Sequence, residues 1–222
     1  MAGKRTRWQI SEDEILREGL FLAREVGLEF SMRQLADRLN TWPNAIYVYF
    51  KDKRELQVAL IDEIFREYLE KVPVEELLDF NVPWDERFRH VATTLYDHMT
   101  DYYRAGYLIS HFGMVGTKSG MEFFRALFAI AFSVGLPIER AVAIFHAAAT
   151  YVLQIIELGS AGKQNISNSD ALDFEKLSDG LPDELSKPII KVMNQGARDR
   201  LINGVDAFIL AAQTEAGQSA KG

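Results

Sequence analysis

Residues 31–53, SMRQLADRLNTWPNAIYVYFKDK, predict two short helices joined by a tight turn and followed at once by the start of another helix. Ser31 suits the cap of the first helix, because its hydroxyl accepts a hydrogen bond from a free backbone N–H. Asn40 suits the turn, since asparagine tolerates a positive φ better than most residues. Pro43 falls in the first turn of the second helix, where a missing N–H costs little. Such a helix-turn-helix can place its second helix in the major groove of DNA.

The second of these helices needs an inner apolar side and an outer side of small or hydrogen-bonding residues. Ile46 and Phe50 are four residues apart and should be its buried pair. We expect the remaining positions to form its outer face: Thr41, Trp42, Asn44, Ala45, Tyr47 and Val48.

Charge is distributed unevenly along the 222 residues. The net charge is −7, but residues 1–56 carry ten Lys and Arg against nine Asp and Glu, so the remainder carries −8. The first ten residues hold Lys4, Arg5 and Arg7 and no acid. This pattern favours a basic arm that contacts nucleic acid beside an acidic body, although a solvated terminus would look the same.

The rest of the chain predicts helices and no convincing strand pair, so the expected fold class is all-α with nine or ten helices. Beyond a first helix from Ser11 to Gly27, helical spacing of apolar residues predicts these helices: 53–72, 84–105 (ended by Gly106), 120–134, 137–158, 182–194 and 197–216. Residues 107–116 should form a short helix or a bent connector. Residues 73–83 should form a link and residues 159–180 a mobile loop. The expected domains are a head at 1–52, a body at 53–216 and a disordered tail at 217–222.

Several classes of function lack their usual signatures. The chain has no cysteine, and His90, His98, His111 and His146 never fall at the spacing of helical metal pairs, so we expect no metal site and no cofactor. There is no Gly-x-Ser-x-Gly elbow, and an all-α enzyme using His98 is a remote alternative. No signal peptide is visible, and apolar runs such as 126–134 are shorter than the ~18 residues of a membrane span. We therefore expect a cytoplasmic non-enzyme without a membrane partner.

Residues 10–57 resemble the DNA-binding domain of the tetracycline-repressor (TetR) family. The resemblance is carried by Ser31, Leu35-Ala36, the turn Asn40-Thr41-Trp42, and IYVYFKDK at 46–53. Asn40 replaces the usual turn glycine, Trp42 a small capping residue and Tyr49 the usual histidine. The resemblance implies a homodimer with a helix-turn-helix head and a larger helical body that binds a ligand and dimerises.

The resemblance also assigns roles to individual residues in the head. It implies phosphate contacts from Tyr47, Tyr49 and Lys53, and a base contact from Arg33. With the outer face, the candidate DNA-binding residues are Arg33, Thr41, Trp42, Pro43, Asn44, Ala45, Tyr47, Tyr49 and Lys53. The expected function is a transcriptional repressor that an apolar small molecule releases from double-stranded operator DNA. An activator, or a constitutive DNA-binding protein without ligand control, is the alternative.

The body offers candidates for a ligand site and for a dimer interface. Aromatic residues are dense between positions 96 and 132, where they either line a cavity or fill a core. The candidate ligand-binding residues are His98, Tyr102, His111, Phe112, Phe128, His146 and Gln154. The two long C-terminal helices should form the dimer interface through Val152, Ile155, Val205, Phe208 and Ile209. The sequence does not identify the ligand, the operator or the regulated genes.

Overall fold

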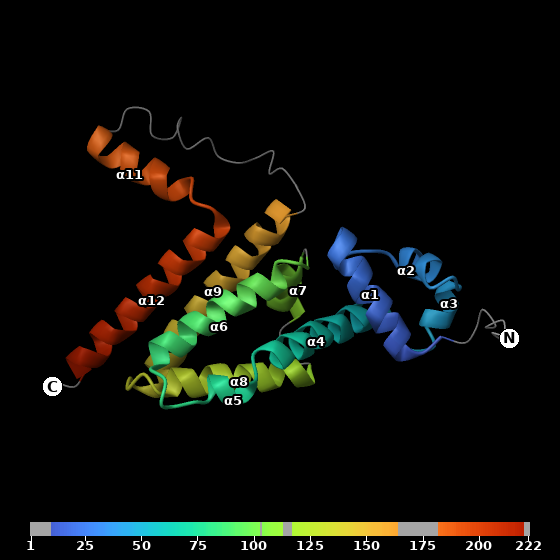
Figure 1. Ribbon diagram of the computed structural model, residues 1–222, viewed down its shortest axis with the longest axis horizontal. Helices are drawn as coiled ribbons and strands as arrows, with labels where there is room; N and C mark the ends of the chain where they lie inside the picture. Colours follow the sequence, from blue (N-terminus) through green and yellow to red (C-terminus); the bar gives the residue numbers. More distant parts are fainter. Residues whose placement is uncertain (1–9, 103, 113–116, 164–181, 220–222) are drawn as a thin grey trace.

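The computed structural model describes residues 10–102, 104–112, 117–163 and 182–219, and every regular element in these ranges is a helix. Eleven helices are present in these ranges, near the nine or ten predicted. They divide into a small head and a longer body, with α3 and the far end of α12 at opposite ends of the molecule (Figure 1). The all-α prediction is confirmed.

The head consists of three helices whose ends follow the predicted signals: α1 (Glu12–Val26), α2 (Met32–Arg38) and α3 (Pro43–Ile46). The Ser31 hydroxyl accepts from the Gln34 N–H at 3.1 Å, and the Gln34 side chain accepts from the Ser31 N–H at 2.7 Å. These reciprocal bonds satisfy two donors that a helix start leaves free. Asn40 turns the chain with a φ of 50°. The helix-turn-helix is therefore built by short-range interactions.

The helix α4 (Lys53–Lys71) leaves the head and enters the body. The Asp52 carboxylate caps it by accepting from the Glu55 N–H at 2.8 Å. Leu60 is buried against Gly19 of α1, and Phe65 is buried against Phe123 of α8, with ring centroids 5.3 Å apart. Buried residues of head and body consequently form one continuous core.

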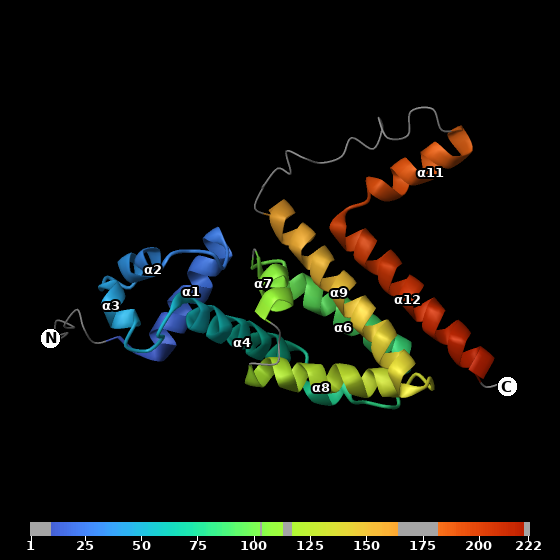
Figure 2. The ribbon, with the colours of Figure 1, turned by 180° about the vertical axis from the view of Figure 1, so that it is seen from behind.

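The body is a bundle of helices around α9. Its members are α5 (Val74–Leu77), α6 (Trp84–Met99), α7 (Ala105–Phe112), α8 (Lys118–Phe132), α9 (Ile138–Lys163), α11 (Asp183–Met193) and α12 (Ala197–Ser219). Helices α6, α7, α8 and α12 all pack on α9. Figure 2 shows α12 running beside α9, with α11 extending away from both. One side of α9 is therefore buried in the core, and another side is exposed.

A buried arginine connects the segment around α5 to the bundle. Arg87 on α6 donates to the carbonyl oxygens of Leu77 at 3.0 Å and Val82 at 3.1 Å, and to the Ser133 hydroxyl at 2.9 Å. Burial lowers the pKa of its guanidinium. These bonds order part of the expected link 73–83, which contains the short helix α5.

The predicted helix 84–105 is shorter than expected. Helix α6 ends at Met99, and α7 begins at Ala105 after Arg104, whose φ is 71°. Gly106 lies inside α7 and does not end a helix, because its missing side chain serves packing. A Cβ at Gly106 would lie 2.5 Å from the Leu153 carbonyl oxygen of α9.

The two C-terminal boundaries also differ from the predictions. Helix α9 continues to Lys163, so residues 159–163 are not the start of a loop; residues 164–181 lie outside the described ranges. A Cβ at Gly159 would clash with the Tyr96 hydroxyl of α6, so this glycine too serves close packing. Helix α12 runs to Ser219, past the expected end at 216, since Gly217 alone does not break a packed helix.

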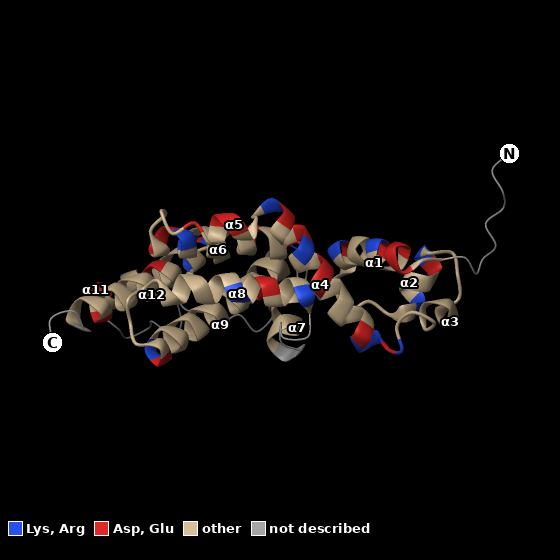
Figure 3. Cartoon of the chain, turned by 90° about the horizontal axis from the view of Figure 1, so that it is seen from below, with Lys and Arg blue, Asp and Glu red and all other residues tan. Residues whose placement is uncertain are grey.

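Charged residues are concentrated away from the centre of α9. Figure 3 shows Lys, Arg, Asp and Glu banding α1, α4 and α6, while α9 is coloured almost only near its start. Residues 141–156 of α9 contain none of these four types. This helix alone among the described residues is long and apolar enough to span a membrane by length and composition, and its packing against four helices is that of a bundle core.

The close approach of α7 to α9 makes a prediction about two glycines. Gly106→Ala should lower the free energy of unfolding by about 1–3 kcal/mol, because the new methyl group meets backbone rather than a flexible side chain. Gly162→Ala on α9 is the matched control: a Cβ there meets nothing within 4 Å, so stability should be unchanged or raised by up to about 1 kcal/mol. Urea unfolding followed by circular dichroism measures both; equal effects would contradict the packing role of Gly106.

Candidate DNA-binding surface and ligand cavity

The exposed end of the head presents a mixed aromatic and polar surface. Trp42 is 51% exposed and Tyr47 44% exposed, and Arg33 and Asn44 are exposed beside them. Trp42 occupies the N-cap position of α3 without a side-chain capping bond, and Pro43 follows at the first position of the helix. This surface offers hydrogen-bonding and apolar groups of the kinds that read base edges.

Two predicted members of the outer face are instead buried. Thr41 is 5% exposed and Ala45 7% exposed, so their predicted outward position is wrong. Helix α3 has only four residues and ends at Ile46, which turns Ala45 inward beside its neighbour Ile46. Val48, at 80% exposure, is the most open of the predicted outer positions.

The predicted phosphate-contacting residues lie at the edges of this surface. The Tyr49 hydroxyl donates to the Ile10 carbonyl oxygen at 2.5 Å, which ties the start of the described chain to α3. The Lys53 ammonium donates to the Glu29 carbonyl oxygen at 2.8 Å, at the N-terminus of α4. Both side chains are therefore held near the surface formed by Trp42 and Tyr47, where the phosphate backbone of a bound DNA would flank it.

The body contains two small apolar cavities. One, of about 100 Å³, lies between α8 and α9 and is lined by residues that include Phe124, Phe128, Phe145 and His146. The other, of about 30 Å³, lies beside it among α4, α6, α8 and α9. Leu127 lines both. Of the candidate ligand-binding residues, Phe128 and His146 line the larger cavity, and His146 is exposed.

The other ligand candidates lie elsewhere. Gln154 is exposed on the outer side of α9. The side chains of His111 and Phe112 lie outside the described part of the chain. His98 and Tyr102 are buried but line neither cavity, and their polar atoms contact the head and α4.

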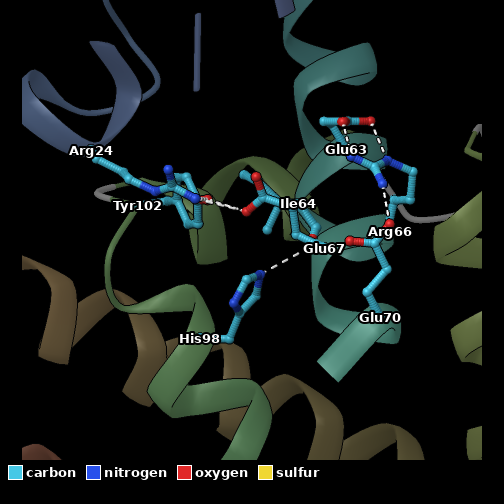
Figure 4. Close-up of polar contacts among 8 residues, drawn as sticks. All are labelled: Arg24, Glu63, Ile64, Arg66, Glu67, Glu70, His98 and Tyr102. Carbon is cyan, nitrogen blue, oxygen red and sulfur yellow. Dashed lines mark hydrogen bonds and ion pairs between the residues drawn. The ribbon is translucent and has the colours of Figure 1, made fainter. Parts of the chain in front are cut away.

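His98 is held between two groups of α4, and Figure 4 shows its contact with the first of them, Ile64. Its Nε2 lies 3.0 Å from the Ile64 carbonyl oxygen, and its Nδ1 lies 3.1 Å from the Lys71 ammonium. These partners assign the neutral tautomer in which Nε2 donates and Nδ1 accepts. Burial, with Lys71 and Arg24 nearby, lowers the pKa of His98 below its ordinary value.

Tyr102 joins the head to the body. Its hydroxyl donates to the Glu67 carboxylate of α4 at 2.8 Å, and Arg24 of α1 donates to the same carboxylate at 2.7 Å and to the Tyr102 hydroxyl. Burial and the Glu67 carboxylate raise the pKa of Tyr102 above its ordinary range. No pattern in the sequence points to Arg24 or Glu67, because both lie on helix faces that look solvated and are far apart along the chain.

The predicted dimer residues are mostly internal to one chain. Val152, Ile155, Val205 and Ile209 are buried within the protomer, Val152 at the cavity that α6 and α8 line, so their predicted position at an interface is wrong. Phe208 is partly buried and its ring centroid lies 5.8 Å from that of Tyr151. The most apolar side of each helix is used within the protomer.

Comparison with known proteins shows which proteins the chain resembles. Residues 15–60 match the bacterial regulatory proteins of the tetR family. The tetracycline repressor protein class G of Vibrio anguillarum is 27% identical over 205 residues, which cover 90% of this chain and 92% of that protein. The chain is therefore similar to regulators of the TetR family, in its head by the family model and over most of its length by this relative.

Two solved structures of TetR-like proteins share the fold. The Streptomyces coelicolor protein ActR in complex with actinorhodin has a TM-score of 0.72 at 18% identity, covering 94% of this chain and 99% of that chain. BioQ with its double-stranded DNA operator has a TM-score of 0.58 at 19% identity, covering 83% and 98%. At these identities the likeness concerns the fold alone.

In the described ranges, no group of three or more His, Asp or Glu residues is placed to hold a metal ion. The polar side chains described above, such as His98, Tyr102 and Glu67, instead form hydrogen bonds and ion pairs between helices.

The environment of His98 predicts a pH dependence of stability. A histidine whose folded pKa is lowered binds its proton more weakly in the folded than in the unfolded state. Stability should therefore fall as the pH drops from about 7 through the unfolded pKa of about 6.5 and toward the lower folded pKa. His98→Gln keeps a donor and an acceptor, and should flatten this dependence.

Thermal unfolding of both proteins between pH 5 and 8 measures the difference, in which the other histidines cancel. Identical pH profiles for the two proteins would show that His98 does not carry the effect.

Proposed function

We propose that the chain is a homodimeric, cytoplasmic repressor that reads operator DNA with α3 and is released by a small, mainly apolar ligand. The observation that carries the proposal is the exposed surface of Arg33, Trp42, Asn44 and Tyr47 on a head that α4 joins to a body with apolar cavities. Repression of its target fits the related tetracycline repressor.

Two kinds of contact with DNA are proposed. Tyr47, Tyr49 and Lys53 would hold phosphates and set the register without reading sequence. Arg33 and Asn44 would read base edges, because an arginine suits guanine and an asparagine suits adenine in the major groove. Trp42 would add an apolar contact, for which a thymine methyl group is the natural partner. DNA binding in this mode fits the complex of BioQ with its operator.

The proposed ligand enters the region between α8 and α9. Phe124, Phe128 and Phe145 surround it with apolar groups, and His146 at its edge supplies a polar one. A strongly charged molecule would lose its hydration there without a partner. The cavities of about 100 and 30 Å³ are smaller than typical ligand pockets of roughly 300 Å³ or more, so binding would require α8 and α9 to separate.

The small cavities favour a second candidate function, a constitutive DNA-binding protein whose body is a filled core. One experiment distinguishes the two. DNA bound by the protein is selected from a random pool, and apolar and polyanionic metabolites are then screened for thermal stabilisation and release of that DNA. Release by an apolar compound supports the repressor; stabilisation and release only by multiply charged compounds would contradict the apolar site, and selection without any release favours the constitutive protein.

The proposed dimer uses the open sides of α9 and α12. On α9 a stripe of exposed, uncharged residues recurs at helical spacing: Ala143, Ala147, Thr150, Gln154 and Leu158. A matching stripe on α12 consists of Asn203, Ala207, Leu210, Ala211 and Thr214. Small side chains allow close approach of helices, and a two-fold axis would pair the stripes into a four-helix interface. Two heads could then meet half-sites about one helical turn (~34–36 Å) apart.

The phosphate role of Lys53 predicts a uniform loss of affinity. Lys53→Ala should weaken binding similarly for selected and mismatched DNA, and should reduce the slope of log affinity against log salt by about one. Lys163→Ala in the body, whose ammonium pairs with Asp101 at 2.7 Å, is the matched control and should leave the slope unchanged. Fluorescence anisotropy at several salt concentrations measures both; a loss limited to one operator base would argue for base reading instead.

The dimer predicts an effect of charge on the exposed stripe. Leu210 is 64% exposed in the protomer, so Leu210→Glu should leave the folded chain intact but yield monomers, because the symmetry places the charge in the interface twice. Leu185→Glu on α11, 55% exposed and outside the stripe, should remain dimeric. Light scattering at micromolar concentration makes the test, and a monomeric wild type would refute the interface.

A further inference from the structure

Two arginines connect the segment between α6 and α7 to the head through hydrogen bonds and ion pairs. The first is Arg24 of α1, which shares the Glu67 carboxylate with the Tyr102 hydroxyl. Figure 4 shows the three side chains converging, and the Arg24 guanidinium carbon also lies 4.9 Å from the centroid of the Tyr102 ring. One carboxylate on α4 therefore joins the head helix α1 to the segment that follows α6.

The second connection is made by an arginine of the segment itself and not by one of the head. Arg104, two residues after Tyr102, lies with its Nε 3.3 Å from the carboxylate of Glu29, in the turn between α1 and α2. Its Nη1 lies 3.6 Å from the Glu157 carboxylate of α9, and its guanidinium carbon lies 4.1 Å from the centroid of the Tyr107 ring. The same short segment thus contacts the head through Tyr102 and through Arg104.

The backbone of this segment does not favour its own conformation. Arg104 has a φ of 71°, in the left-handed region that residues with a side chain rarely adopt. The Thr100 hydroxyl is buried without a hydrogen-bond partner among the described residues. Backbone bonds from the Tyr102 N–H to the Met99 carbonyl oxygen and from the Ala105 N–H to the Tyr102 carbonyl oxygen, both 3.0 Å, order the segment locally. Its side-chain contacts fix its position against the head, and their loss would let it move relative to the head.

The head has room to change its angle. Gly19 of α1 rests against Leu60 of α4, where an added Cβ would lie 3.0 Å from the leucine side chain. Beside this contact, α1 and α4 border a groove of about 470 Å³ that reaches Phe21, Arg24 and Glu67. The arrangement suits a pivot at Gly19, with the Arg24–Glu67–Tyr102 cluster fixing the angle at one end of the groove.

The segment also directly follows α6, which lines the smaller cavity. Phe88, Val91, Ala92 and Leu95 of α6 line the 30 Å³ cavity, and α6 ends four residues later at Met99. Separation of the cavity walls would displace α6 and, with it, Tyr102. The path from cavity to head through this segment does not require α4 to bend.

We propose that Arg24, Glu67 and Tyr102 form a latch that fixes the angle between head and body, and that Tyr102 is a positioning residue for DNA binding. The proposal rests on the proposed dimeric repressor. With the latch closed, the two heads keep one separation; with it open, each head turns about Gly19 and the half-sites are no longer matched.

The absence of cysteine from the chain allows a direct test of this latch. Asp37→Cys, on the exposed side of α2, accepts one spin label per protomer, and pulsed electron paramagnetic resonance then gives the head-to-head distance distribution in the dimer. Tyr102→Phe, which keeps the ring, and Arg24→Gln should each broaden this distribution. Each should also weaken binding to wild-type-selected DNA by about tenfold, within the usual range of coupling between sites.

Two controls separate the latch from a general loss of structure. Arg66→Gln removes the ion pairs of Arg66 with Glu63 and Glu70 on α4, which do not reach the head, and should change neither measurement (Figure 4). The exchange of Arg24→Glu with Glu67→Arg restores an ion pair across the same gap, and should narrow the distribution and recover affinity.

The outcomes are distinct from those of the proposed function. A wild type with no dipolar signal, or with no selected DNA, would refute the dimeric DNA-binding protein itself. A dimer that binds selected DNA, in which Tyr102→Phe and Arg24→Gln behave as Arg66→Gln does, would overturn the latch. Tighter DNA binding in those two variants would overturn it as well.

Discussion

The arrangement of this protein depends on the burial of α4 from two directions. Its first turns pack on α1, where Leu60 lies against Gly19, and its later turns pack on α8, where Phe65 and Tyr68 both contact the Phe123 ring. The buried Gln57 amide adds a bond to the Leu28 carbonyl oxygen at 3.0 Å, which ties the turn after α1 to the same helix. Because head and body share this helix, neither has a complete core without the other.

Features set by interactions over a few residues could be predicted from the sequence. The caps at Ser11 and Ser31, the positive φ of Asn40 and the proline start of α3 all act within one helical turn, so the pattern determines them. The errors arise where tertiary packing decides. Gly106 looks like a helix end but is the point at which two backbones meet.

The candidate sites show the same division between local and long-range effects. The reading surface follows from the motif, except where the shortness of α3 turns Ala45 inward. The bonds of Tyr102 to Glu67 and Arg24 span 35 and 78 residues, and no periodicity in one sequence connects them. Most of the residues predicted for the dimer interface lie in the protomer's own core, because apolar spacing along a helix does not show which neighbour covers its apolar side.

The two sides of α9 have a consequence for how the proposed dimer responds. Ala149 lines both cavities, while its neighbours Ala147 and Thr150 lie on the exposed stripe. A helix is stiff along its length, so a molecule that pushes Ala149 outward also presses the stripe against the symmetry-related helix. In the proposed dimer, a ligand bound in one subunit would therefore move the α9 helix that lines the cavity of the other subunit. The two sites should then bind ligand cooperatively, so that the response to ligand concentration is steeper or shallower than that of independent sites.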